Sequence, residues 1–169
     1  GKKYVAETFQ IHEKYQQIDF EKLPNAFVVK ANHDTGSVIL VKNKTSFDFK
    51  KAERKITKAL NRVYGWTKGE WAYSYIVPKV LVEEYIGIVA DSPPPDYKFH
   101  CVNGKVRFCQ YIYDRGVDTK EVITDKRGIP FNFVLFEDFK QGSGFNIPEK
   151  WREMIKVAEI LSEDFKYVR

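Results

Sequence analysis

The sequence predicts an α+β protein, because β-branched and aromatic runs joined by turn residues alternate with two segments of helical spacing. Two hairpins are indicated, at residues 23–42 and 96–115, and two helices, at residues 49–63 and after Pro148. At 169 residues the chain has room for one hydrophobic core, or for two small lobes that share one. We therefore expect antiparallel sheets with helices packed on them.

The first hairpin joins the run Phe27 to Lys30 to the run Val38 to Val41 through a loop of polar and small residues. Side chains alternate along a strand, so Lys30 lies opposite Phe27 and Val29, away from the more apolar face. A cation beside exposed loop N–H groups suits an anionic group such as phosphate. An ordinary hairpin with a solvated lysine is the alternative, and these residues alone favour it.

Residues 49–63 carry apolar side chains at helical spacing, with Ser46 or Asp48 as the N-cap and Gly65 as the end. The lysines and arginines of this helix lie largely between the apolar positions. We interpret them as a solvated face.

The stretch VPKVLVEEYIG predicts a buried strand from Val80 to Tyr85 that meets the paired acids Glu83 and Glu84 at its end. Two interpretations stay open: the strand runs out into solvent, or a site lies at its end. Ser92 to Pro95 follow as a stiff connector whose prolines have no backbone donors.

The second hairpin is centred on Asn103-Gly104, read as a two-residue type I′ turn that pairs Val102 with Lys105. In this register one face is apolar apart from Gln110, and it comprises Tyr97, Phe99, Cys101, Val106, Phe108 and Ile112. The other face is polar, and it comprises Asp96, Lys98, His100, Arg107 and, if the strand continues, Arg115. Such a face is either solvated or the floor of a cleft with one acid and several cations.

The same register places Cys101 and Cys109 on opposite faces, which disfavours a disulfide between them. The two cysteines have no metal-ligand spacing, so we read them as packing residues. Two reduced thiols fit a reducing cytosol.

The net charge of +5 is modest, and no dense basic block resembles a nucleic-acid arm. No apolar segment approaches the length needed to span a membrane. We expect a cytoplasmic protein; anionic small molecules and anionic polymers fit its charge equally well, but nucleic acid is not expected as a partner. Towards the C-terminus, Pro148 opens a helix whose apolar stripe predicts core packing: Trp151, Ile155, Ala158, Leu161 and Phe165.

Four stretches together resemble the ATP-grasp superfamily: LPNAFVVKANHDTG, KVLVEEYIG, DYKFHCVNGKVRF and AEILSEDFKYVR. They are most similar to its TupA-like branch, associated with teichuronopeptide and capsular polysaccharide synthesis, and the likeness runs from about Ile18 to Arg169. The resemblance implies an ATP-grasp-like fold of two α+β lobes with antiparallel sheets that grip ATP. It also implies a connecting segment at 1–22, a first lobe at 23–80, and a linker with a second, incomplete lobe at 81–169.

Carried over position by position, the resemblance implies that Lys30 contacts the ATP phosphates and that the loop after it closes over them. The loop residues concerned are Asn32, His33, Thr35, Gly36 and Ser37. Adenine is expected at the segment Glu83, Glu84, Tyr85 and Ile86, largely through the main-chain carbonyl of Glu84 and the N–H of Ile86. Asp96 matches the acid that holds the ribose hydroxyls, and Lys98 faces the phosphates. Arg115 and Arg169 match arginines expected near the transferred phosphoryl group or the acceptor carboxylate.

Two departures from the family pattern bear on activity. Asp34 replaces part of a loop that is richer in glycine in the family, which stiffens the loop and puts a negative charge near phosphate. The resemblance also implies Mg²⁺, with ligands that begin beyond the match to Arg169. No metal ligand is therefore assigned within this chain.

Three functions follow from the resemblance. The first is an ATP-dependent carboxylate-amine ligase of cell-surface polysaccharide synthesis, acting through an acyl phosphate on a sugar-acid, amino-acid or glycan acceptor. The second is an ATP-dependent glycan or sugar kinase. The third is a catalytically inactive module that binds nucleotide or acidic glycan through its cationic face.

Overall fold

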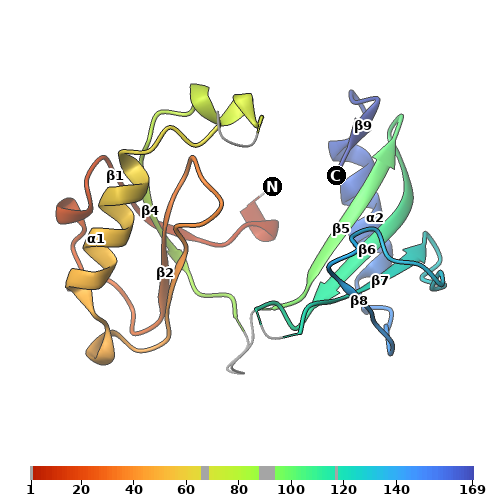
Figure 1. Ribbon diagram of the computed structural model, residues 1–169, viewed down its shortest axis with the longest axis horizontal. Helices are drawn as coiled ribbons and strands as arrows, with labels where there is room; N and C mark the ends of the chain where they lie inside the picture. Colours follow the sequence, from red (N-terminus) through yellow and green to blue (C-terminus); the bar gives the residue numbers. More distant parts are fainter. Residues whose placement is uncertain (1, 66–68, 88–93, 117) are drawn as a thin grey trace. The chain divides into compact units, whose positions relative to one another are not determined.

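The computed structural model describes residues 2–65, 69–87, 94–116 and 118–169 of the chain (Figure 1). The first half of the connector predicted at Ser92 to Pro95 lies outside these described residues. Contacts between residues divide the chain into two compact units, Gly1–Ile86 and Gly87–Arg169. No helix in the described ranges is long and apolar enough to cross a membrane.

The first unit is built on a four-stranded antiparallel sheet with the order β1-β4-β2-β3. Its strands are β1 (Thr8–His12), β2 (Phe27–Ala31), β3 (Ile39–Val41) and β4 (Val80–Glu84). In β2, Phe27, Val29 and Ala31 are buried while the residues between them are half-buried, which is the alternation expected of a sheet with one covered face. The predicted hairpin and the predicted buried strand are both confirmed.

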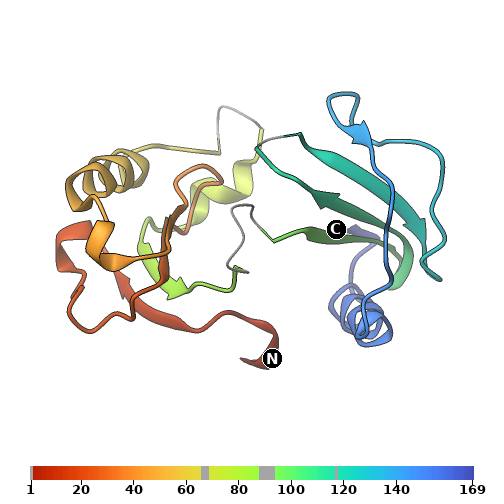
Figure 2. The same ribbon diagram turned by 90° about the horizontal axis from the view of Figure 1, so that it is seen from below.

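Helix α1 (Phe49–Leu60) covers that face of the first sheet and buries Ala52, Ile56 and Ala59 against it (Figures 1 and 2). Asp48 is the N-cap, because its carboxylate accepts a hydrogen bond of 2.9 Å from the amide of Lys51. The helix ends before Val63, which is 61% exposed, so the predicted helix is confirmed but its last turn is not.

Short 3₁₀ turns connect these elements in the first unit. They are η1 (Lys2–Tyr4), η2 (Tyr15–Gln17), η3 (Lys44–Ser46) and η4 (Trp71–Tyr75).

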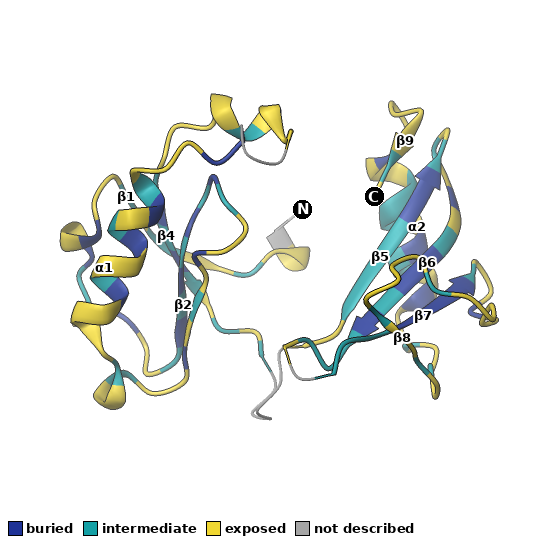
Figure 3. Cartoon of the chain, viewed as in Figure 1, coloured by how far each residue is buried: buried dark blue, intermediate teal, exposed yellow. Residues whose placement is uncertain are grey.

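The second unit has a five-stranded sheet with the order β8-β7-β6-β5-β9, antiparallel except between β7 and β8. Its strands are β5 (Asp96–Val102), β6 (Lys105–Tyr113), β7 (Lys120–Asp125), β8 (Lys140–Gln141) and β9 (Tyr167–Val168). Helix α2 (Trp151–Leu161) packs on one face of this sheet through Trp151 and Ile155. Figure 3 shows that buried residues lie along the strands of both units. Leu161 and Phe165 are both exposed, and Phe165 lies beyond α2, so the prediction that these two residues pack in the core was wrong.

The hairpin turn has positive φ angles at Asn103 and Gly104, as the predicted type I′ turn requires. The register then shifts by one residue: Cys101 pairs with Val106, but His100 pairs with Phe108, so Arg107 is the extra residue of a β-bulge.

This bulge corrects the predicted faces of β6. Phe108 stacks on His100, with ring centroids 4.1 Å apart, instead of sharing a face with Cys101. Cys109 joins Cys101 in the core under α2, so the prediction that the two cysteines face opposite ways was wrong. Both thiols are nevertheless free and buried.

Two features differ from the residue ranges expected for the lobes. Strand β1 lies within the segment 1–22 that was expected only to connect, and it pairs with β4. Strand β4 also pairs with β2, which places residues 80–86 in the first compact unit. The ranges of the two family lobes stay a prediction.

Candidate functional site

Lys30 lies on the open face of the first sheet, opposite the face that α1 covers. Its ammonium group is 2.6 Å from the Glu83 carboxylate on the neighbouring strand, and the two side chains are 34% and 17% exposed. In the register of β2 and β4, Lys30 pairs with Leu81 and Glu83 pairs with Val28, so the ion pair is diagonal on one face. A half-exposed ammonium group is thus held in a fixed position beside apolar neighbours.

The loop after Lys30 is held in place by its own side chains. Asn32 donates from its side-chain amide to the carbonyl of Val77 at 3.0 Å and accepts from the amide of Lys79 at 2.8 Å. The buried ring of His33 donates to the carbonyl of Arg62 at 3.2 Å, and Thr35 hydrogen-bonds the hydroxyl of Tyr64. Because these side chains are engaged within the protein, the loop would contact a ligand through its backbone.

Asp34 engages part of that backbone. Its Oδ1 atom accepts hydrogen bonds from the Ser37 amide at 3.2 Å, the Ser37 hydroxyl at 2.5 Å and, more weakly, the Gly36 amide at 3.4 Å. Its Oδ2 atom lies 3.2 Å from a guanidinium nitrogen of Arg62, and its side chain is only 2% exposed. Asp34 therefore acts as an internal anion at the loop that was expected to receive phosphate.

The segment expected to recognise adenine leaves β4 at the edge of the described first unit. The amide of Glu84 donates to the carbonyl of Glu7 at 2.8 Å, which continues the pairing with the N-terminal chain. Tyr85 is half-buried and Ile86 is exposed beyond the strand. In the described part of the chain the amide of Ile86 donates no hydrogen bond.

In the second unit, Asp96, Lys98 and His100 lie on the face of the sheet away from α2. The guanidinium Nε atom of Arg115 lies 2.5 Å from Asp96 Oδ2, an ion pair without the alignment of a hydrogen bond. The structure thus brings two predicted site residues from β5 and from the end of β6 into contact.

Lys98 has both arginines and acids in its surroundings. Burial, followed by the nearby charges of Arg169 and Arg115, lowers the pKa of the Lys98 ammonium group. Lys98 and Arg169 also border a hollow of about 510 Å³ whose other lining residues are mostly apolar and come from β5, α2 and β9. Asp96 pairs with Arg115 and offsets part of the repulsion, and the positive charge that is left would suit an anion.

Two buried polar contacts near Lys98 were not predicted. Glu121 is fully buried and accepts hydrogen bonds from Gln110 at 2.6 Å and from the amides of Leu135 and Phe136 at 2.5 and 3.0 Å. His100 pairs through Nδ1 with the hydroxyl of Tyr167 at 2.8 Å, and burial lowers its pKa. For Glu121, the one signal in the sequence was its position as a charged residue inside the apolar run KEVIT.

The described ranges of the chain contain no group of three histidine, cysteine, aspartate or glutamate side chains that could hold a metal ion. These residues do not fit a Mg²⁺ site, so no step below depends on one of their side chains binding the metal.

Each unit has an antiparallel or mixed sheet that carries basic residues on the face its helix leaves open, as expected of ATP-grasp lobes. Residues 1–169 match the family described as TupA-like ATPgrasp, and the chain belongs to that family. ATP-grasp proteins bind ATP and are typically ATP-dependent ligases. No curated protein and no solved structure matches the chain.

Proposed function

We propose that this chain binds ATP for a carboxylate-amine ligase of cell-surface polysaccharide synthesis. Lys30 is assigned to the ATP phosphates, the backbone of residues 32–37 to the same group, and residues 83–86 to adenine. In the second unit, Asp96 is assigned to the ribose hydroxyls and Lys98 to the phosphates. Arg115 and Arg169 are assigned to the transferred phosphoryl group or the acceptor carboxylate.

The observation that carries this proposal is the crowding of Arg115 and Arg169 around Lys98. Burial lowers the pKa of Lys98 most, and repulsion from Arg169 and Arg115 lowers it further, while Asp96 and Glu121 act in the opposite direction. A polyphosphate relieves that repulsion, whereas a neutral ligand does not. Because the chain belongs to an ATP-grasp family, we take ATP to be this polyphosphate.

The reaction that we propose has two steps. An acceptor carboxylate oxygen attacks the γ-phosphorus of ATP, and ADP leaves, which gives an acyl phosphate. An amine then attacks the acyl carbon and inorganic phosphate leaves. Negative charge shifts among oxygens in both steps, so positioned cations stabilise the transition states more than they stabilise the free reactants.

Asp34 favours a second candidate, a nucleotide-binding module without catalysis. Its carboxylate already accepts hydrogen bonds from Ser37 and pairs with Arg62, so the loop is held by an internal anion. Under this candidate ATP binds but no ADP forms. An Asp34→Gly variant that gains ATP affinity without gaining ADP formation would favour it.

The proposal is tested by calorimetric titration of ATP with Mg²⁺ into the chain and into a Lys30→Ala variant. Loss of one charged contact to phosphate lowers affinity by roughly tenfold to a hundredfold. Because Lys30→Ala leaves Glu83 to repel phosphate, a Lys30→Ala/Glu83→Gln variant separates the lost attraction from the new repulsion. Lys50→Ala on the exposed side of α1 is the matched control and should stay within about twofold.

Absence of ATP binding to the unmodified chain would contradict the proposal. If the unmodified chain and both Lys30 variants bound ATP with equal affinity, only the phosphate role of Lys30 would be refuted, and ATP binding by the chain would stand.

A further inference from the structure

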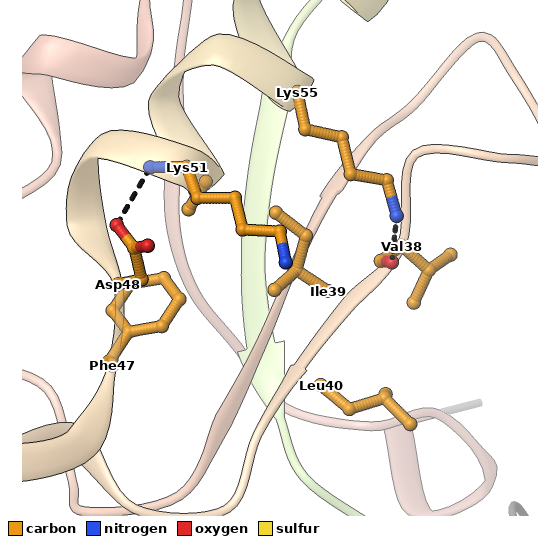
Figure 4. A pocket seen from close by; sticks show the side chains of 8 residues that line it. Val38, Ile39, Leu40, Phe47, Asp48, Lys51 and Lys55 are labelled. Atoms are coloured by element: carbon orange, nitrogen blue, oxygen red, sulfur yellow. Dashed lines mark hydrogen bonds between the residues drawn. The ribbon is translucent and has the colours of Figure 1, made fainter.

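A groove runs between α1 and the outer strand β3 of the first sheet. It consists of two adjacent hollows of about 360 and 160 Å³ that share Lys55. Figure 4 shows the larger hollow, with Val38, Ile39 and Leu40 on the strand side and Lys51 and Lys55 on the helix side. We call the two hollows together the α1–β3 groove.

The helix side of the α1–β3 groove is a row of cations. Lys51, Lys55 and Lys58 line it at spacings of four and three residues, which places them on one face of α1, and Arg62 follows just beyond the end of the helix. In the described residues, the ammonium groups of Lys51 and Lys58 form no ion pair. These ammonium groups lie on the face that we interpreted as solvated, and they are open to an acidic ligand.

The acids near this row are already engaged. Asp48 caps α1 through the amide of Lys51, and Asp34 is buried against Arg62 and Ser37. Glu53, the acid within α1, accepts a hydrogen bond from Gln16 at 2.6 Å. The groove thus has an excess of positive charge that an acidic ligand would neutralise.

The strand side of the groove is an open sheet edge. In the described residues β3 pairs only with β2, so one side of its backbone has no strand partner. The carbonyl of Val38 points into the groove, because it accepts a hydrogen bond of 2.9 Å from Lys55 Nζ (Figure 4). Backbone groups of a strand point the same way every second residue, so the N–H and C=O of Leu40 face the groove too.

We propose that the α1–β3 groove binds an extended acidic peptide, which adds as a strand to β3 and places its carboxylates on the lysine row. The peptide backbone pairs with Leu40, and a peptide N–H replaces Lys55 as the donor to Val38. Alternate peptide side chains then face Lys51, Lys55 and Lys58, while the others lie beside the half-exposed side chains of Val38 and Leu40.

Other occupants fit these observations less well. A second copy of this chain that paired β3 with β3 would bring two rows of lysines together, which like-charge repulsion opposes. A nucleic acid or an acidic polysaccharide matches the charge, but neither has the amide backbone that the open edge of β3 can pair with. The larger hollow is on the α1 side of the sheet, away from Lys30, whereas the smaller hollow includes Gly36 and Ser37 of the loop assigned above to the ATP phosphates.

The test is fluorescence anisotropy with a labelled octapeptide of alternating glutamate and valine. We expect binding that a Lys55→Glu/Lys58→Glu variant weakens at least tenfold, because two attractive contacts become repulsive. Lys50→Glu/Arg54→Glu is the matched control, since it changes the net charge equally on exposed positions of α1 outside the groove. Circular dichroism checks that both variants keep their helix.

A second arm changes the peptide and leaves the protein unmodified. N-methylation of alternate amides removes the donors that pair with β3 but keeps every carboxylate, and we expect it to weaken binding at least tenfold. Absence of peptide binding, equal binding of the methylated peptide, or equal loss in the control variant would each overturn the proposal. So would equally tight binding of an oligonucleotide or a polyuronate of the same charge.

Discussion

Replacing Glu121 by alanine removes the carboxylate that ties residues 135–136 to the second sheet. In the structure this side chain is fully buried and accepts three hydrogen bonds, two of them from the amides of Leu135 and Phe136. Hydrogen bonds to a charged group are each worth about 1.5–3 kcal/mol net. Because the freed amides lie on a partly exposed segment and can reach water, we expect a total loss of about 3–5 kcal/mol in the second unit.

Glu121→Gln is the informative partner of this variant. Its oxygen can still accept from the two amides, but its new NH₂ group meets the NH₂ group of Gln110. The Oε1 atom of Gln110 has no partner among the described residues, so rotation of the Gln110 amide restores a donor and an acceptor. We therefore expect Glu121→Gln to cost only about 1–2 kcal/mol.

Urea unfolding combined with amide hydrogen exchange distinguishes these outcomes. In Glu121→Ala the amides of Leu135 and Phe136 should exchange rapidly while those of β5 and β6 stay protected. In Glu121→Gln both amides should keep most of their protection. Unchanged exchange in the alanine variant, with a stability within about 1 kcal/mol of the unmodified chain, would refute the reasoning.

Two further predictions concern titratable groups. Burial raises the pKa of the Cys109 thiol to about 12, so the folded chain should resist thiol reagents at Cys109 near pH 8 and react fully once unfolded; rapid labelling of the folded chain would contradict this. Burial and the neighbouring arginines lower the pKa of Lys98, so its positive charge is lost as pH rises at a lower pH than in an ordinary lysine. ATP affinity should therefore fall on the alkaline side in the unmodified chain and fall less in Lys98→Arg, and parallel pH profiles for the two proteins would count against a phosphate contact at Lys98.

Much of the fold follows from short-range patterns in the sequence. The alternation of Phe27, Val29 and Ala31 predicted one covered face of the first sheet, and it placed Lys30 on the other face. The Asn103-Gly104 turn predicted the hairpin and its first two residue pairs. These features depend on local geometry, which a sequence encodes directly.

The bulge at Arg107 could not be read in the same way. An extra residue in a strand depends on how the strand packs, and nothing in the run KVRFCQY marks it. Because strand faces alternate, this one residue reversed the predicted faces from Phe108 onwards. Strand β1 was missed for a related reason: only its pairing with β4, far away in the sequence, makes residues 8–12 a strand.

In the candidate site, too, contacts between residues far apart in the sequence were not predicted. The contact between Lys30 and Glu83 was not predicted as an ion pair, because diagonal pairing depends on the register of two strands that are distant in sequence. Glu121 was missed because its partners, Leu135 and Phe136, lie in a segment without a regular pattern. The residues that the family resemblance singled out in the second unit, Asp96 and Arg115, do lie together.

The most direct test of ATP binding by this chain is photolabelling with 8-azido-ATP, followed by mass spectrometric mapping of the labelled peptides. The azide is attached to the adenine ring, so it labels what lies beside the base. We predict labelling in residues 83–87, suppressed by excess ATP, because the amide of Ile86 donates to no group among the described residues and is assigned here to adenine. Labelling confined to α1, or labelling that ATP does not suppress, would contradict the assignment of this chain's ATP site.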